Sequence, residues 1–431
     1  MTERAPRPTR RGLVRSVVGI SAAAAAGLPR SADADPGVGG QCKGISPERG
    51  ENLVEPFWGP HQGGITTPAQ THNYTATLDL VTTKRDDLIR LLRLWTSASA
   101  TMTSDIPAQL GLAPDVSDSG EAVGLRPSRL TVTFGFGAGL FVNDGKDRYR
   151  LASQWPPALV DLPSFHGDQL IETRTGGDLS VQACADDPQV AFHAVRQLVR
   201  LAHGAARLRW AQTGFIPGFR PNETPRNMVG FKDRTSNPPV DDPATMEKFV
   251  WVGEEGPDWM GGGSYVVFRR IRIALEHWDR MPLDFQERTI GRYKYSGAPL
   301  GQQNEFDPPD LNAVDEDGNP VIPESAHVRL AAAASNDGAR ILRRSYSYND
   351  GVDFTIERWP PWRQGMAYDA GVFFVCYQRD PRTGFNKIFD KMAKFDMLNE
   401  FVTHTGGGLF ACPGGISQGE FVGQRLIDAA G

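Results

Sequence analysis

Residues 72–97, HNYTATLDLVTTKRDDLIRLLRLWTS, decide the class of fold. The first ten of them alternate apolar and polar side chains, as a half-buried β-strand does. Residues 82–97 then carry leucines on a helical period, with Asp86 and Asp87 in the first turn, where the helix dipole favours negative charge. The leucines are Leu88, Leu91, Leu92 and Leu94. The stretch therefore predicts a strand followed directly by a helix.

The same order of elements continues along the chain. In the first half we expect strands at 130–141 and 178–185 and an amphipathic helix at 188–205. In the second half the patterns predict a strand at 264–273, a helix at 274–280, a strand at 371–379 and a helix at 386–401. The glycines of 130–141 indicate a close approach of backbone or ligand. The repeat predicts an α+β protein with two similar units, each an antiparallel sheet with helices on one face.

Length and composition limit the classes of function. A chain of 431 residues with 40% apolar and 23% charged residues is typical of a globular protein with two or three domains. The net charge of −5 provides no basic surface for nucleic acid. The four cysteines show no zinc-binding spacing, so we expect buried or free thiols, although export would permit a disulfide.

The N-terminus has the features of an export signal. Residues 9–14 (TRRGLV) carry a twin-arginine signature, and the alanine-rich stretch behind them is too short to span a bilayer. A small-x-small site at 32–34 predicts cleavage before Asp35. We therefore expect a signal peptide at 1–35, domains at 36–225 and 226–431, no membrane span, and a periplasmic or extracellular protein.

Two further stretches carry residues suited to redox chemistry. His327 precedes the pair Arg343-Arg344 by sixteen residues, and a neutral imidazole is a common axial ligand of haem iron. An arginine nearby can stabilise negative charge on a bound oxygen species. The stretch 230–238 (GFKDRTSNP) places Asp233 in a turn-rich loop, either as an ordinary loop residue or as an acid/base.

These motifs, in this order, identify a resemblance to the dye-decolourising peroxidases, in particular their twin-arginine-exported, deferrochelatase-like branch. The resemblance covers nearly all of the chain after the signal peptide. It rests on the segments 62–65 (QGGI), 130–141, 230–237, 291–292, 297–301 (GAPLG), 327–329 (HVR), 341–346 (ILRRSY), 398–401 (LNEF) and 404–415. It implies two tandem ferredoxin-like domains packed as a dimeric α+β barrel, the architecture also found in chlorite dismutases. One haem b per chain would bind in the C-terminal domain.

The resemblance also implies a role for individual residues. His327 corresponds to the proximal ligand of the haem iron, and Asp396 is the candidate partner of its imidazole. Asp233 corresponds to the distal acid/base and Asn237 lies on the same side. Arg343 corresponds to the distal arginine. The alternatives are Arg344 for this arginine and His277 as a rival ligand.

One residue departs from the family pattern. The family's Gly-x-x-Asp-Gly motif ends here in Arg234, and glycine allows a backbone conformation that a long side chain does not adopt freely. Arg234 can project outward, lie near a haem propionate, or lower the pKa of Asp233.

The implied activity is oxidation of bulky aromatic donors, such as dyes and phenolics, by hydrogen peroxide in one-electron steps, with a carboxylate acid/base that favours acid pH. The alternatives are release of iron from haem, as in a deferrochelatase, and a haem carrier or sensor without turnover. A homo-oligomer and an iron-uptake system are the further partners that we expect.

Overall fold

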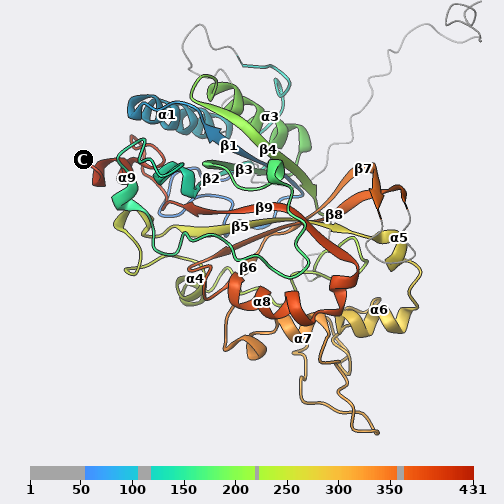
Figure 1. Ribbon diagram of the computed structural model, residues 1–431. Helices are drawn as coiled ribbons and strands as arrows, with labels where there is room; N and C mark the ends of the chain where they lie inside the picture. Colours follow the sequence, from blue (N-terminus) through green and yellow to red (C-terminus); the bar gives the residue numbers. More distant parts are fainter. Residues whose placement is uncertain (1–53, 105–117, 219–222, 357–363) are drawn as a thin grey trace, which may run out of the picture. The chain divides into compact units, whose positions relative to one another are not determined.

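The strands of the chain form one antiparallel sheet that closes on itself (Figure 1). The computed structural model describes residues 54–104, 118–218, 223–356 and 364–431, which all belong to one compact unit; the predicted signal peptide and Cys42 lie outside them. The strands are β1 (His72–Leu80), β2 (Thr131–Phe136), β3 (Leu179–Ala185), β4 (Ala206–Phe215), β5 (Ser264–Ile273), β6 (Leu342–Arg343), β7 (Tyr346–Ile356), β8 (Gln364–Gln378) and β9 (Val402–Cys412).

The helices lie outside this sheet. They are α1 (Arg85–Met102), α2 (Ala138–Phe141), α3 (Pro188–Leu201), α4 (Pro243–Phe249), α5 (Leu275–Trp278), α6 (Leu283–Ile290), α7 (His327–Ala331), α8 (Phe385–Phe395) and α9 (Gln424–Ala429). In Figure 1, α1 and α3 lie above the strands, whereas α6, α7 and α8 lie below them. None of the helices in the described ranges is long and apolar enough to cross a membrane.

Each half of the chain contributes a four-stranded sheet of the same topology. The order is β4-β1-β3-β2 in the first half and β9-β5-β8-β7 in the second, the antiparallel order of a ferredoxin-like unit. The two sheets meet at Phe136 and Ala411, between β2 and β9, and at Phe215 and Ser347, between β4 and β7. The predicted α+β class and barrel are therefore confirmed, and the domain boundary at 225/226 stays a prediction.

Several element predictions need correction. The sequence patterns missed β4, β6, β7 and β9, and residues 138–141, predicted as strand, form the short helix α2. Gly137, which precedes α2, packs closely against backbone: a Cβ there would lie 2.1 Å from the carbonyl oxygen of Gly177. The predicted close approach at these glycines is thus confirmed. The helix predicted at 386–401 ends earlier, at Phe395.

The first half is held together by the apolar faces of α1 and α3. Leu88, Leu91 and Leu92 of α1 are buried in the core, as their helical period predicts, whereas Leu94 is only partly buried. Asp187 caps the start of α3 by accepting hydrogen bonds from the backbone N–H groups of Gln189 and Val190. Each such buried leucine stabilises the fold by about 2 kcal/mol.

In the second half, strand alternation separates two environments. Phe268 of β5, Phe373 of β8 and Phe410 of β9 pack with Trp210 of β4 in a cluster between the strands of both halves. The neighbouring side chains of β5 and β8 point to the outer face, toward α7 and α8. Three cysteines, Cys184, Cys376 and Cys412, are buried and free, as expected for small apolar residues.

Candidate active site

A large cavity lies between the outer face of the second sheet and the helices below it. Its volume is about 810 Å³, within the range of pockets that bind cofactors and small ligands. Its walls are largely apolar and come from β5, β8, β9, α6, α7 and α8. They include Ile271, Ile273, Ile290, Val328, Val372, Phe374, Phe385, Ile388, Phe389, Met392 and Val402. His327, Asp233, Asn237, Arg343 and Asp396, the five residues predicted for the site, all line this cavity.

His327 is the first residue of α7 and is held by a buried carboxylate. Its Nδ1 lies 2.6 Å from Oδ2 of Asp396, the residue directly after α8. The other oxygen of Asp396 accepts a hydrogen bond of 2.9 Å from the backbone N–H of Leu398, and only 3% of its side chain is exposed. A carboxylate on Nδ1 fixes the tautomer of the imidazole and leaves Nε2 available as a ligand.

Asp233 reaches the cavity from the loop between β4 and α4. The backbone N–H of Asp233 donates to the carbonyl oxygen of Pro225 at 2.9 Å, which closes the loop. Oδ1 of Asp233 lies 2.9 Å from Nη1 of Arg343 and 2.7 Å from the backbone nitrogen of Arg234, which donates to it. Both contacts fall on the same carboxylate oxygen.

The alternation of β6 decides which of the paired arginines faces the cavity. β6 pairs with β8 through Leu342 and Arg343, and Leu342 is buried in the cluster between the sheets. Because successive side chains of a strand point to opposite faces, Arg343 faces the cavity. Arg344 turns back inward, where it donates to the carbonyl oxygen of Thr67 and to Oε1 of Gln70. The geometry therefore distinguishes Arg343 from its alternative, Arg344.

Asn237 fixes the backbone of Arg343. Its Nδ2 donates to the carbonyl oxygen of Arg343 at 2.7 Å, and its Oδ1 accepts from the backbone N–H of Arg343 at 3.2 Å. This two-way pairing joins the loop that carries Asp233 to the strand that carries Arg343. Asn237 thus acts on the position of the arginine.

The charges around Asp233 determine its protonation. Burial alone would raise the pKa of this carboxyl group, but the guanidinium groups of Arg343 and Arg234 outweigh burial and hold its pKa below the ordinary value. The backbone hydrogen bond from Arg234 lowers the pKa further. Asp233 is therefore a carboxylate over most of the acid pH range.

Other cavity residues received no role from the sequence. His404 of β9 lines the cavity, and burial, with a contribution from Arg269, lowers its pKa to about 3, so this imidazole is neutral. Arg292 also lines it, and its Nη1 donates to the carbonyl oxygens of Gly297 and Glu305. The segment 291–292, already part of the resemblance, was the available signal for Arg292. The rival ligand His277, in α5, is not among the described residues that line the cavity.

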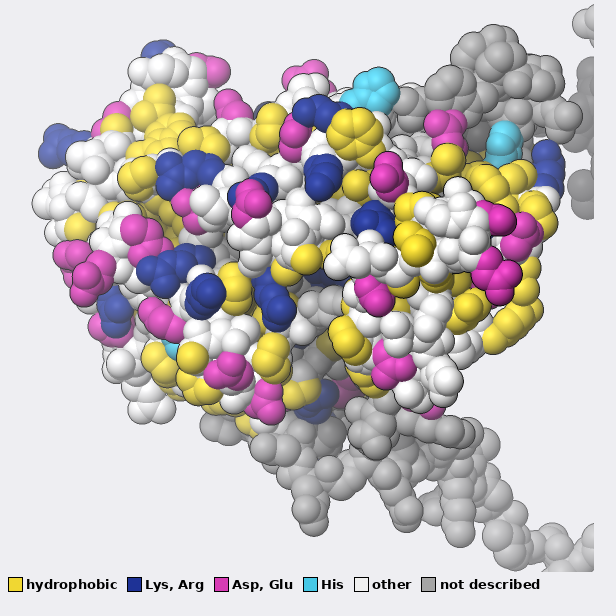
Figure 2. All heavy atoms as spheres, turned by 90° about the horizontal axis from the view of Figure 1, so that it is seen from below, with side chains coloured by type: hydrophobic (Ala, Val, Ile, Leu, Met, Phe, Trp, Pro, Cys, Tyr) yellow, Lys and Arg dark blue, Asp and Glu magenta, His cyan; other side chains and the backbone are white. Residues whose placement is uncertain are grey.

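The surface around the lower helices carries mixed charge. Figure 2 shows this face, with basic and acidic side chains interspersed among small apolar groups. Such a surface produces no extended field of one sign.

Two family models match the chain in tandem. The Dyp-type peroxidase N-terminal model matches residues 62–216 and the Dyp-type peroxidase C-terminal model matches residues 224–417. The chain belongs to the Dyp-type peroxidase family. It is 39% identical to a dye-decolorizing peroxidase of Thermobifida fusca over 85% of this chain and 84% of that protein. It is 36% identical to a deferrochelatase of Escherichia coli strain K12, over 89% of each.

Solved structures show the same relationship. The crystal structure of a DyP-type peroxidase from Streptomyces coelicolor matches with a TM-score of 0.78 and 41% identity, over 87% of this chain and 97% of that one. The ferric form of DtpA from Streptomyces lividans matches with the same TM-score and 40% identity over the same shares. The predicted resemblance is therefore confirmed.

Within this Dyp-type peroxidase, Arg234 keeps the backbone conformation that suits a glycine. Its φ is +67°, in the left-handed region that side chains disfavour. The guanidinium turns inward, where Nη2 donates to the carbonyl oxygen of Ser345 and the group lies 5.6 Å from the ring centre of Tyr346. The sequence left three possibilities open for Arg234. In the structure its side chain turns inward, and its charge lowers the pKa of Asp233.

Proposed function

We propose that this Dyp-type peroxidase binds haem b in the cavity, with Nε2 of His327 as the protein ligand of the iron, and uses hydrogen peroxide to oxidise bulky aromatic donors. The observation that carries the proposal is one cavity lined by a carboxylate-held histidine, a carboxylate–arginine pair and extended apolar walls. An imidazole donor within an apolar cavity of this size suits an iron porphyrin. Haem, when bound, supplies the redox chemistry.

The chain's own residues orient the ligand and handle the proton. Asp396 holds His327 by its Nδ1–H and raises the basicity of Nε2. Oδ1 of Asp233 is occupied by Arg343 and by the backbone of Arg234, so Oδ2 is the atom that takes a proton from peroxide and returns it. The fixed guanidinium of Arg343 stabilises negative charge that develops on the peroxide oxygens.

The location and the donors belong to the same proposal. The twin-arginine motif at Arg10 and Arg11 supports export to the periplasm or beyond. Donors too large for the cavity would pass electrons to the protein surface. The name of the Thermobifida fusca relative supports dyes as donors, and phenolics stay a prediction. A homo-oligomer and an iron-uptake partner stay predictions.

A second function is supported by the names of other relatives. The deferrochelatase of Escherichia coli is 36% identical over 89% of this chain. For this chain, the name suggests release of iron from haem with the porphyrin left intact. Porphyrin fluorescence that appears together with free iron would identify this activity, and loss of the porphyrin or no change would exclude it.

The decisive experiment compares Asp233→Asn with the parent protein. Haem-loaded proteins are mixed with peroxide at mildly acid pH, and the change of the Soret band is followed by stopped-flow absorbance. We expect a fast change in the parent and a change slowed by about 10²-fold or more in Asp233→Asn, because the amide cannot take the proton. Asp241→Asn, an exposed position of the same loop, is the matched control and should react like the parent.

Equal rates in Asp233→Asn and the parent would refute the role of Asp233. A parent protein that binds haem but does not react with peroxide would refute the proposed peroxidase activity. Haem carriage and release of iron from haem would then be the remaining functions. Both outcomes are read from the same spectra. Haem binding is measured first, so that loss of the cofactor is not mistaken for loss of the acid/base.

A further inference from the structure

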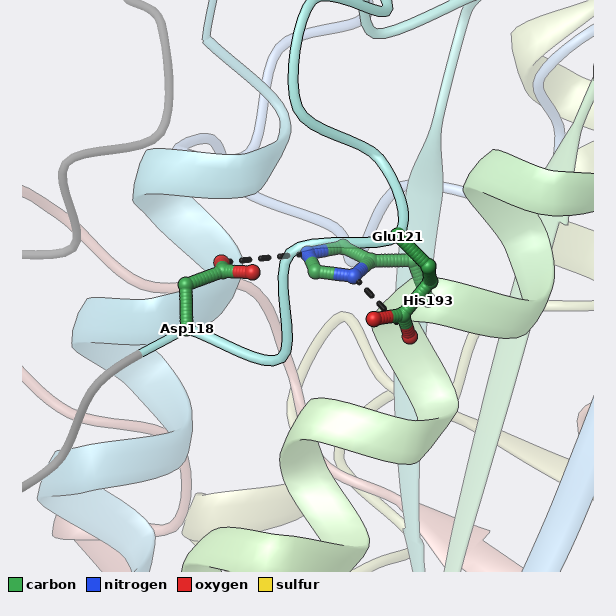
Figure 3. Close-up of side chains that lie close together, drawn as sticks. All are labelled: Asp118, Glu121 and His193. Atoms are coloured by element: carbon green, nitrogen blue, oxygen red, sulfur yellow. Dashed lines mark ion pairs between the residues drawn. The ribbon is translucent and has the colours of Figure 1, made fainter.

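A group of three potential metal ligands lies in the first half of the chain, far along the sequence from His327. His193 projects from α3 toward the segment 118–124, where Asp118 and Glu121 face its ring from two sides (Figure 3). None of these three residues is among those that line the cavity of the proposed haem site. Any ligand bound here is therefore separate from the peroxidase chemistry.

The spacing of the three side chains suits one cation. Nε2 of His193 lies 3.3 Å from Oδ2 of Asp118, and Nδ1 lies 3.2 Å from Oε1 of Glu121. One ligand atom from each residue can be chosen so that all lie within 4.8 Å of one another. Zinc binds nitrogen and carboxylate oxygen at about 2.0–2.2 Å, so ligand atoms on one ion lie up to about 4 Å apart. An ion takes one of the two ring nitrogens, so the carboxylate that faces the other nitrogen has to turn toward the ion to complete the site.

These polar atoms are buried without hydrogen bonds. His193 is only 4% exposed. Both of its ring nitrogens, both carboxylate oxygens of Glu121 and Oδ2 of Asp118 are buried and make no hydrogen bond of acceptable geometry. Buried polar atoms need a partner, and a cation bound to one ring nitrogen would be a partner for that nitrogen and for the carboxylate oxygens that face the ring.

The charges of the group also suit a cation. Asp118 and Glu121 set two carboxylate groups against the single imidazole of His193. Arg196 contacts Oε2 of Glu121 at 3.1 Å, and Oε1 is the oxygen nearest to His193. Gln197 donates to Ser119 at 2.6 Å and so helps to fix the segment on α3.

We propose that Asp118, Glu121 and His193 bind one divalent transition-metal ion of the zinc class. An imidazole with two carboxylates favours such an ion over calcium and magnesium, which prefer ligand sets made of oxygen alone. With three protein ligands, a fourth position is left for water. The ion ties the segment 118–124 to α3 and thereby stabilises the outer side of the first sheet.

The test measures zinc in the full-length, haem-loaded protein. After equilibration with zinc and dialysis, zinc and iron per chain are determined by atomic emission, and Co²⁺ is used as a spectroscopic probe of the site. We expect one zinc per chain in the parent and loss of that zinc in His193→Gln. His203→Gln, at an exposed histidine just after α3, is the matched control and should keep the zinc.

Two further variants make the outcome unambiguous. Glu121→Gln keeps the size of the side chain and should weaken zinc binding by more than about tenfold, because even indirect partners of a metal ligand have effects of that size. It therefore tests the site if His193→Gln fails to fold. His327→Ala removes the proposed haem ligand and should leave the zinc content unchanged. Retention of zinc by His193→Gln, or a parent protein that retains none, would overturn the proposal.

Discussion

Substitution of Arg234 separates two effects of this side chain. The residue sits at a φ of +67°, a conformation that costs residues with a side chain about 1–2 kcal/mol and glycine nothing. Arg234→Gly and Arg234→Ala both remove the guanidinium and its contacts with Ser345 and Tyr346. The two variants differ only in the methyl group of alanine, so their difference in stability reports the cost of the backbone conformation. Relative to alanine, glycine lowers the free energy of unfolding by about 0.4–1 kcal/mol, because it increases the entropy of the unfolded chain.

The expected difference in stability follows from these values. Arg234→Gly should be more stable than Arg234→Ala by about 1 kcal/mol, measured by urea unfolding of the haem-loaded protein. At Asp241, an exposed residue of the same loop that has no positive φ and does not line the cavity, the order should be reversed, with alanine more stable than glycine. Equal stability of the two Arg234 variants, or a more stable alanine variant, would refute the strained backbone.

The pH dependence of the same variants tests the charge. In the parent, Arg343 and Arg234 together lower the pKa of Asp233, so this group stays a carboxylate down to lower pH. The acid limb of the kcat/KM profile therefore lies at low pH. Removal of the Arg234 guanidinium raises this pKa, and the acid limb moves to higher pH. Both variants should show the same shift, since they lose the same charge. No shift in either would show that Arg234 does not act on Asp233.

Three further predictions concern the remaining groups of the site. Asp396→Asn should reduce haem retention by about 10–100-fold, measured by transfer to apomyoglobin, because the imidazole of His327 loses its carboxylate partner. Asp390→Asn, at an exposed position of α8, is the control and should retain haem like the parent. Arg343→Leu should lower kcat/KM for peroxide by about 10²–10³-fold and move its acid limb to higher pH, because the strongest cation beside Asp233 is lost; an unchanged acid limb would contradict this. Dye oxidation by the parent should be fastest at acid pH, and a maximum at pH 7 or above would argue against a carboxylate acid/base.

The elements predicted well are those whose pattern is local. The alternation of β1, the helical leucines of α1 and the amphipathic pattern of α3 all depend on a few neighbouring residues, and these elements appear where expected. The missed strands β4, β7 and β9 depend on partners far along the chain. β9, for example, contains three consecutive glycines at 406–408, which disfavour a strand by themselves but fit where its backbone lies against residues 174–176.

The sequence by itself determined the α+β class, the family and the residue types of the site, because these follow from periodicity and from short motifs of consecutive residues. Only the tertiary structure decided that Arg343 rather than Arg344 faces the cavity, since this depends on the pairing of β6 with β8. It alone also brought His193 against Asp118 and Glu121, since contacts between distant residues follow from how the chain packs. The inward turn of Arg234 has the same origin: its partner, the carbonyl group of Ser345, comes from another element.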